Sequence, residues 1–229
     1  MIAPLINFKI AGAIWYQGES NTLSYSTYAD LFKALITEWR KQWKVDFPFY
    51  YVQIAPYAYD NPFVGALLRE QQELALDLPK TGRVVITDLV DNIKDIHPKD
   101  KRGVGNRLAA LALGDYYRKT DEEYQSPTYE SMVMDKGKLV LHFKYAEGGL
   151  QIEEGRFAKE FYIAGEDRIF KPAEVTLFRD RVILQHREIK QPVAVRFSFS
   201  NEGMSNVFNK AGLPLAPFRT DNWPVVTTK

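Results

Sequence analysis

Ala-Gly-Ala-Ile-Trp-Tyr-Gln-Gly, residues 11–18, is a short apolar run that ends at a glycine, and this pattern is typical of a buried β-strand. Residues 49–54 and 83–87 form two further apolar runs of strand length. Apolar residues at helical spacing lie between and after these runs, over residues 28–43, 64–75 and 104–117. Strands that alternate with amphipathic helices predict parallel βαβ units.

The pattern changes near Thr120. Short alternating or apolar runs follow without helices between them, at residues 131–134, 138–145, 160–164, 174–178, 181–185 and 193–200. Asp135-Lys136-Gly137 and Arg179-Asp180 fit hairpin turns. We therefore predict an α/β domain over residues 1–120 and a β-rich, antiparallel, sandwich-like domain over residues 121–229, with an extended proline-rich tail.

Composition limits the function. The chain has 229 residues, a net charge of +1 and no cysteine. The charge argues against a nucleic-acid partner, and no apolar run approaches the roughly 20 residues of a membrane span. Residues 1–10 lack the pattern of a signal peptide. A cytosolic protein and a chain shortened at its front end both fit that absence.

Polar residues follow two of the expected strands. Gln17-Gly18-Glu19 comes after the first strand, and Asp95 and His97 come after the third. The carboxyl ends of parallel strands meet at one edge of a sheet, so these two loops can share a site. His97 can act as a general base and Asp95 can orient it. The Gln17 amide and a backbone N–H near Gly18 can stabilise an oxyanion. Pro98 is suited to open the next helix.

Other interpretations of these residues stay open. An isolated Asp-x-His pair is more often a solvated loop, and Gln17 and Glu19 could cap the following helix. Glu19 with Asp95 could form the acid/base pair of a glycosidase. The three histidines are widely spaced and include no His-x-His pair, so no metal site is predicted.

Four segments resemble the sialate O-acetylesterases, which are SGNH (GDSL-like) hydrolases close to the acetylxylan esterases. One of them, residues 214–223, resembles their closing segment. Residues 12–21 resemble their central block, and residues 95–98 together with 105–108 resemble their histidine block. Leu68-Arg-Glu-Gln-Gln72 resembles their Leu-Arg-Glu-x-Gln helix. The resemblance implies a flavodoxin-like three-layer hydrolase domain joined to β-rich domains. It also implies removal of O-acetyl groups from sialic acid or other glycans, without a metal or organic cofactor.

Carried over by position, His97 is the catalytic base, Gln17 is an oxyanion donor, and Arg69 and Gln72 are candidate pocket residues. Many members place the acid three residues before the histidine, where this chain has Lys94. Asp95 is the nearest carboxylate. Two other carboxylates, Asp91 and Glu19, remain candidates for the acid.

The nucleophilic serine of the family lies upstream of the Gln-Gly-Glu block, yet residues 1–16 contain no serine. Ser20, Ser24 and Ser26 follow the block and are poor replacements. The sequence therefore predicts an incomplete esterase, whose amino-terminal part is missing. The exposed sheet edge would then be covered by self-association or by a complementing segment. The family implies a periplasmic or secreted full-length protein. The competing hypothesis is a glycan-binding or structural module without catalysis.

Overall fold

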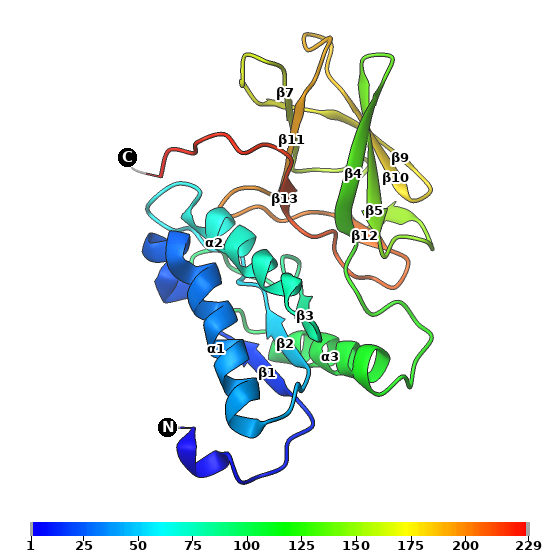
Figure 1. Cartoon of the computed structure of the whole chain (residues 1–229). Helices are drawn as coiled ribbons and strands as arrows, with labels where there is room; N and C mark the ends of the chain where they lie inside the picture. The colour runs from blue at the N-terminus through cyan, green and yellow to red at the C-terminus, as the bar shows by residue number, and fades with distance from the viewer. Residues whose placement is uncertain (1, 228–229) are drawn as a thin grey trace.

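A computed structural model describes residues 2–227. Three parallel strands form the first sheet, β1 (Ala13–Tyr16), β2 (Phe49–Val52) and β3 (Thr81–Val84), in the order β1-β2-β3. The expected α/β pattern is confirmed (Figure 1). The third strand is shorter than the predicted 83–87, because its partner β2 ends at Val52.

Helices cover both faces of this sheet. Side chains of β2 alternate between the faces: Phe49 and Tyr51 pack in one core with α1 (Tyr28–Trp43) and Leu68 of α2 (Val64–Glu73). Tyr50 and Val52 pack in a second core with α3 (Lys101–Leu111). Strand β2 is buried along its whole length, as expected of the central strand of a parallel sheet. The sheet and the helices on its two faces therefore form three layers.

Short helical turns connect these elements. They are the 3₁₀ segments η1 (Ala3–Leu5), η2 (Glu19–Thr27) and η3 (Leu74–Asp77), and the π-helical turn η4 (Ala112–Tyr116) that follows α3. None of the helices among residues 2–227 has the length and apolar character needed to cross a membrane.

Antiparallel strands dominate the chain after residue 120. One sheet has the order β4-β5-β10-β9, and a second has the order β13-β11-β7-β8. A two-stranded ribbon pairs β12 with β6. The bounds are β4 (Thr128–Asp135), β5 (Lys138–Lys144), β6 (Leu150–Ile152), β7 (Phe161–Ala164), β8 (Lys171–Pro172), β9 (Glu174–Phe178), β10 (Arg181–Gln185), β11 (Ala194–Phe197), β12 (Val207–Asn209) and β13 (Phe218–Arg219). Both larger sheets contribute to a single apolar core.

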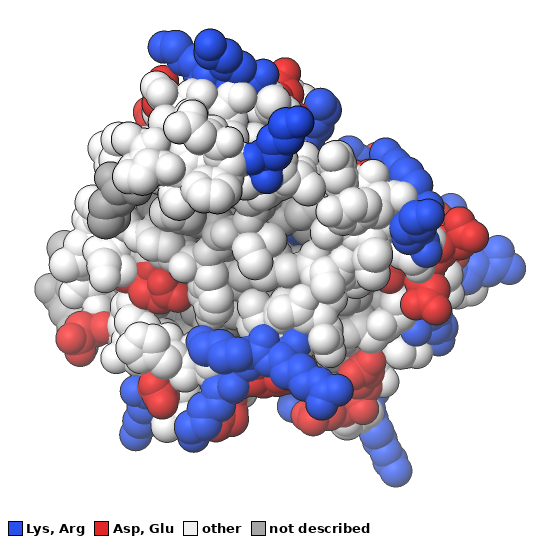
Figure 2. Space-filling view, turned by 90° about the horizontal axis from the view of Figure 1, so that it is seen from below, with Lys and Arg blue, Asp and Glu red and all other residues white. Residues whose placement is uncertain are grey.

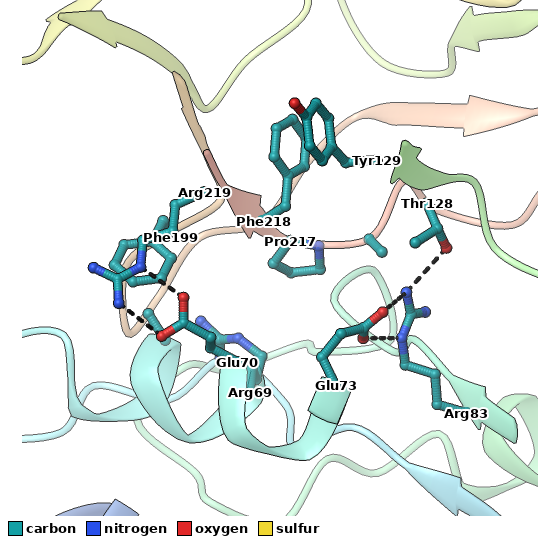
Figure 3. Close-up of a pocket in the computed structure, with 12 residues that line it drawn as sticks. Arg69, Glu70, Glu73, Arg83, Thr128, Tyr129, Phe199, Pro217, Phe218 and Arg219 are labelled. Atoms are coloured by element: carbon teal, nitrogen blue, oxygen red, sulfur yellow. Dashed lines mark hydrogen bonds and ion pairs between the residues drawn. The ribbon is translucent and has the colours of Figure 1, made fainter. Parts of the chain in front are cut away.

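Helix α2 joins the parallel sheet to the β-rich part. Arg219 of β13 forms two hydrogen bonds of 2.6 and 2.8 Å with the Glu70 carboxylate. On the other side of a cavity of about 200 Å³, Glu73 pairs with Arg83, which donates to Thr128 at 3.0 Å (Figure 3). Because the cations at this junction are paired with carboxylates of α2, they hold the two parts together.

Candidate functional site

The predicted catalytic and oxyanion residues lie on loops at the carboxyl ends of the parallel strands, whereas the predicted pocket residues Arg69 and Gln72 lie in α2. Gln17 follows β1 directly, and the loop after β3 contains Asp95 and His97. The Lys101 ammonium, in the first turn of α3, lies 5.1 Å from the centre of the Tyr16 ring. The chain just beyond His97 therefore contacts the residue just before Gln17, and the two loops occupy the same end of the sheet.

The Gln17 side chain is half-buried and hydrogen-bonded. Its Nε2 donates to Oδ1 of Asn21 at 2.7 Å, and its Oε1 accepts from the Tyr28 hydroxyl at 3.2 Å. The second N–H of the amide makes no hydrogen bond to the described residues. An amide held at both ends presents that N–H in a fixed direction, as an oxyanion donor requires.

Gly18 and Gln72 fix the backbone of this loop. A Cβ at Gly18 would lie 2.7 Å from Cγ2 of Ile54, so the loop can approach β2 only with glycine at this position. Gln72 is fully buried. Its Oε1 accepts from the Ile54 N–H at 2.9 Å, and its Nε2 donates to the Gln17 carbonyl at 3.2 Å. The side-chain oxygen and nitrogen of Gln72 thus bind the backbone of the chain after β2 and of the loop after β1.

Arg69 is also buried, with 1% of its surface exposed. Its Nη2 donates to the Ser200 carbonyl of the β-rich part, while Nε and Nη1 have no partner among the described residues. Burial lowers the pKa of the guanidinium to about 10. Arg69 therefore remains a cation at neutral pH, with free donors in the interior.

His97 is solvent-accessible, with 84% of its side chain exposed. Its Nδ1 lies 3.9 Å from Oδ1 of Asp95, which is too long for a hydrogen bond. The same Asp95 oxygen accepts the backbone N–H of His97 at 3.0 Å. Asp95 therefore shapes the loop in this structure, and a small side-chain rotation would be needed for it to bind the imidazole.

The other two candidate acids have different surroundings. Asp91 accepts a hydrogen bond of 2.9 Å from Lys99, and this contact lowers the pKa of the carboxyl. Glu19 lies in the loop after β1. Its charge, together with burial as the larger cause, raises the pKa of Tyr16 to about 12. Of the three carboxylates, Asp95 is the one for which a contact with the His97 imidazole is observed among the described residues.

Two tyrosine hydroxyls lie buried at this end of the sheet. Burial and the Glu19 charge raise the pKa of Tyr59 as well as that of Tyr16. Neither hydroxyl has a hydrogen-bond partner among the described residues. Both phenols stay protonated at neutral pH, so they can donate hydrogen bonds but cannot act as bases.

Sequence reasoning missed Asn201. Its Oδ1 accepts from the Gly65 N–H at 2.9 Å, and its Nδ2 donates to the carbonyls of Tyr59 and Asn61 at 3.3 and 2.8 Å. Its own carbonyl accepts from the Tyr57 N–H at 3.1 Å. One side chain of the β-rich part thus organises the loop after β2. No local pattern around Asn201 could have indicated this role.

Sequence reasoning also misplaced the start of α3. The helix begins at Lys101, three residues after Pro98, because the Asp100 carboxylate accepts the Gly103 N–H at 2.7 Å and caps it. Arg107 then binds Asp88 through two hydrogen bonds of 2.6 and 2.5 Å. This pair ties the loop after β3 to the helix.

Within residues 2–227, no group of three or more histidine and carboxylate side chains is arranged to hold a metal ion. Ser20, Ser24 and Ser26 are all exposed in η2. No hydroxyl of the described residues is hydrogen-bonded to the His97 imidazole.

Residues 2–114 match the family model of carbohydrate esterases described as sialic acid-specific acetylesterases. The mouse sialate O-acetylesterase is 26% identical over 87% of this chain and 41% of its own length. The human protein is 31% identical over 63% of this chain and 32% of its own length.

A solved structure agrees with these relatives. The crystal structure of a carbohydrate acetylesterase from Xanthomonas citri superposes with a TM-score of 0.91 at 40% identity, over 97% of this chain and 53% of that one. This chain thus spans about half of that protein and less of the curated relatives. Together, the family model over residues 2–114, the relatives and the shared structure support the sialic acid-specific acetylesterase family of carbohydrate esterases for this chain.

Proposed function

We propose that this chain supplies the histidine, its acid and an oxyanion donor of a carbohydrate O-acetylesterase that hydrolyses acetyl esters on sialic acid or other glycans. The observation that carries the proposal is the fixed Gln17 amide with one free N–H, on a loop that adjoins the segment carrying His97. The family resemblance supplies the ester chemistry.

In this mechanism the His97 imidazole takes the proton of a serine hydroxyl as the oxygen attacks the acetyl carbonyl. The carbonyl oxygen becomes an oxyanion and accepts hydrogen bonds from Gln17 Nε2 and a backbone N–H at Gly18. His97 then protonates the departing sugar oxygen, and the sugar leaves with a free hydroxyl while the acetyl group stays on the serine. In the second half of the reaction His97 takes a proton from a water molecule, whose oxygen attacks the acetyl-serine and releases acetate and the free serine. The Asp95 side chain rotates toward Nδ1 of His97, and its carboxylate then stabilises the imidazolium. Gln72 acts as a positioning residue, because it holds the Gln17 carbonyl.

The serine, in this proposal, comes from a polypeptide segment outside the present sequence. Strand β1 pairs with β2 alone among the described strands, and its Ile14 is 69% exposed. An unpaired strand edge presents free backbone N–H and C=O groups that can pair with another strand, so the free edge of β1 suits a further strand. Figure 2, which views the molecule from below, shows a broad area with few charged side chains. In Figure 1, β1 and the N-terminal segment lie at that lower end.

The test is complementation. The chain is assayed on an aryl acetate alone and after refolding with the half of the Xanthomonas citri relative that this chain does not match. The expected result is turnover by the mixture only, abolished by His97→Ala. Turnover by the isolated chain that His97→Ala abolishes would show a nucleophile within this chain. Turnover by the mixture that survives His97→Ala would remove His97 from the mechanism.

The full-length protein that contains this chain is proposed to be periplasmic or secreted, since its substrates are glycans. Signal-peptide cleavage at the amino terminus of the native full-length protein would support this location. An uncleaved cytosolic protein would contradict it.

A further inference from the structure

A second cavity, of about 560 Å³, lies between the loops of the parallel sheet and the β-rich part. Phe63 before α2, Ile93 in the loop of His97, Tyr162 of β7 and Phe170 before β8 all line it. Its size is within the range of pockets that bind small molecules. The mechanism proposed above uses none of these side chains.

The walls of this pocket combine the faces of aromatic rings with carboxylates that can accept hydrogen bonds. Phe63 and Phe199 stack with ring centres 6.3 Å apart. Tyr162 is 36% exposed, so its ring can meet a ligand. Glu160 and Glu202 add carboxylates to the lining. Aromatic faces that pack on apolar surface, with a few polar groups that fix orientation, are the usual make-up of a small-molecule site. A sugar ring offers both apolar C–H faces and hydroxyl donors.

The charges of the pocket disfavour an anionic ligand. Arg196, its cation, binds the buried Asp221 carboxylate through two hydrogen bonds of 2.9 and 2.8 Å. The same guanidinium lies 4.1 Å from the centre of the Phe170 ring. Its charge is therefore already neutralised. Because Glu160 and Glu202 then dominate the potential, a ligand carboxylate would be repelled and a neutral, hydroxyl-rich ligand would be accepted.

Two residues that line this pocket, and a third next to a lining residue, have strained backbone conformations. Phe63, Glu160 and Ser198 all have left-handed conformations, with φ of 62°, 67° and 47°. Such conformations are uncommon for residues with a bulky side chain. Such a conformation costs free energy and persists where the surroundings enforce it, often at ligand sites. Two of the strained residues hold each other, since the Ser198 N–H donates to the Glu160 carbonyl at 3.0 Å.

The pocket adjoins the loop that carries His97, because Ile93 of that loop lines it. The Ala58 N–H donates to the carbonyl of Ile93 at 2.8 Å, and Ile93 precedes His97 by four residues. Asn201, next to the lining residues Ser200 and Glu202, holds the loop after β2. The loop that carries His97 therefore also forms part of the pocket wall.

We propose that this aromatic pocket binds a neutral sugar unit of the acetylated glycan, beside the unit whose ester is cleaved; the proposal rests on the esterase function given above. Binding energy from this unit would position the ester without contact with the reacting atoms. The pocket is thus a specificity site for neutral oligosaccharide chains.

Methionine methyl groups provide the test. Met204 lines the pocket, whereas Met132 and Met134 lie on β4 in another sheet. We would label the methionine methyls with ¹³C, assign Met204 with Met204→Leu, and titrate the chain with xylotetraose as the neutral probe. The Met204 resonance should shift in a saturable manner while those of Met132 and Met134 stay in place. The absence of a saturable Met204 shift at millimolar xylotetraose would overturn the proposal.

Variants assign the binding to the aromatic walls. Tyr162→Ala should weaken xylotetraose binding by about three- to tenfold, the loss of one aromatic contact. Glu202→Gln, at an exposed position, gives a second variant that should fold. The matched control is Phe178→Ala, because Phe178 is 55% exposed on β9 away from the pocket. Equal affinity of the Tyr162→Ala variant and the unmodified chain would contradict the proposal.

N-Acetylneuraminic acid is the anionic probe, and tighter binding of it at Met204 than of xylotetraose would also overturn the assignment. The esterase function is tested separately, since aryl acetate hydrolysis does not need the pocket. Failed complementation with intact Met204 binding would remove the esterase function and leave a sugar-binding pocket without a role in ester cleavage. Successful complementation without Met204 binding would remove the pocket alone.

Discussion

Gln72 Nε2 donates a hydrogen bond of 3.2 Å to the carbonyl of Gln17. A residue on α2 thereby holds the backbone of the loop after β1. The same side chain accepts the Ile54 N–H at 2.9 Å, so it also holds the chain after β2. The position of the Gln17 amide depends on a side chain that is itself fully buried.

Replacing Gln72 should therefore destabilise the chain. Gln72→Ala leaves the buried Ile54 N–H without a partner, at a cost of about 1–3 kcal/mol, and leaves the Gln17 carbonyl with the Tyr28 hydroxyl as its remaining donor. Urea denaturation followed by tryptophan fluorescence would measure the loss. Gln42→Ala is the matched control, since Gln42 is exposed on α1. A change in the free energy of unfolding no larger than that of Gln42→Ala would show that these hydrogen bonds do not form in solution.

Replacing Gln17 should reduce turnover rather than substrate binding. In the complemented enzyme, Gln17→Ala is expected to lower kcat by about 10²–10³-fold, the effect of losing one oxyanion donor, with little change in KM. Steady-state kinetics on an aryl acetate would measure both constants. Asn21→Ala is the comparison, because it removes the acceptor of Gln17 Nε2 but keeps the amide. An unchanged kcat for Gln17→Ala would exclude the amide as an oxyanion donor.

The Asn201 side chain gives a prediction for the junction between the two parts of the chain. Asn201→Ala removes the partner of the Gly65 N–H and frees the carbonyls of Tyr59 and Asn61. We expect a loss of about 1–3 kcal/mol in the free energy of unfolding and faster amide exchange at Gly65. Hydrogen exchange by mass spectrometry would locate the change. Unchanged exchange in the segment containing Gly65 would contradict the assigned role.

Local elements of this fold could be predicted from sequence. The strand predicted at residues 181–185 has those bounds as β10. The predicted turn at residues 135–137 joins β4 to β5, with Lys136 and Gly137 at φ of 49° and 79°. Both features depend on neighbouring residues alone, because alternation and turn chemistry are local.

Long-range contacts of the site could not be predicted in this way. Asn201 and Gly65 are 136 residues apart, and nothing near either residue marks the contact. The same holds for Arg69 and Ser200. The Asp95 conformation is another example, since Asp-x-His can bind either the imidazole or the backbone N–H and the spacing does not distinguish them. Whether Gln17 and His97 act on one ester stays a prediction.

The Glu160 carboxyl gives a pH-dependent stability. Burial raises its pKa above the ordinary 4.5, and the Lys159 charge opposes the shift. The native state therefore binds this proton more tightly than the unfolded state, so stability falls as pH rises through the native pKa. Glu160→Gln should be more stable than the unmodified chain at pH 8, and this advantage should disappear below the unfolded pKa. Thermal unfolding from pH 3 to 8 would measure it.

Exposed Glu166 provides the control for that comparison. Glu166→Gln should change the midpoint temperature of unfolding by a similar small amount across the pH range. A Glu160→Gln advantage that is the same at pH 3 and pH 8 would show that the carboxylate charge is not its cause.

The free edge of β1 predicts association. Ile14 lies on this strand with 69% of its surface exposed, and the exposed Phe8 and Leu5 precede it. A parallel strand with an unpaired edge and apolar side chains can pair with another chain. We therefore expect a concentration-dependent increase in mass by sedimentation velocity. Ile14→Asp should reduce the association and also weaken complementation by the serine-bearing segment, because both partners would use the same edge.

Ile169→Asp, which changes an isoleucine of 58% exposure just before β8, should affect neither process. If both variants associate as strongly as the unmodified chain, contacts elsewhere on the surface must cause the association, and the β1 edge would no longer be assigned as the docking edge.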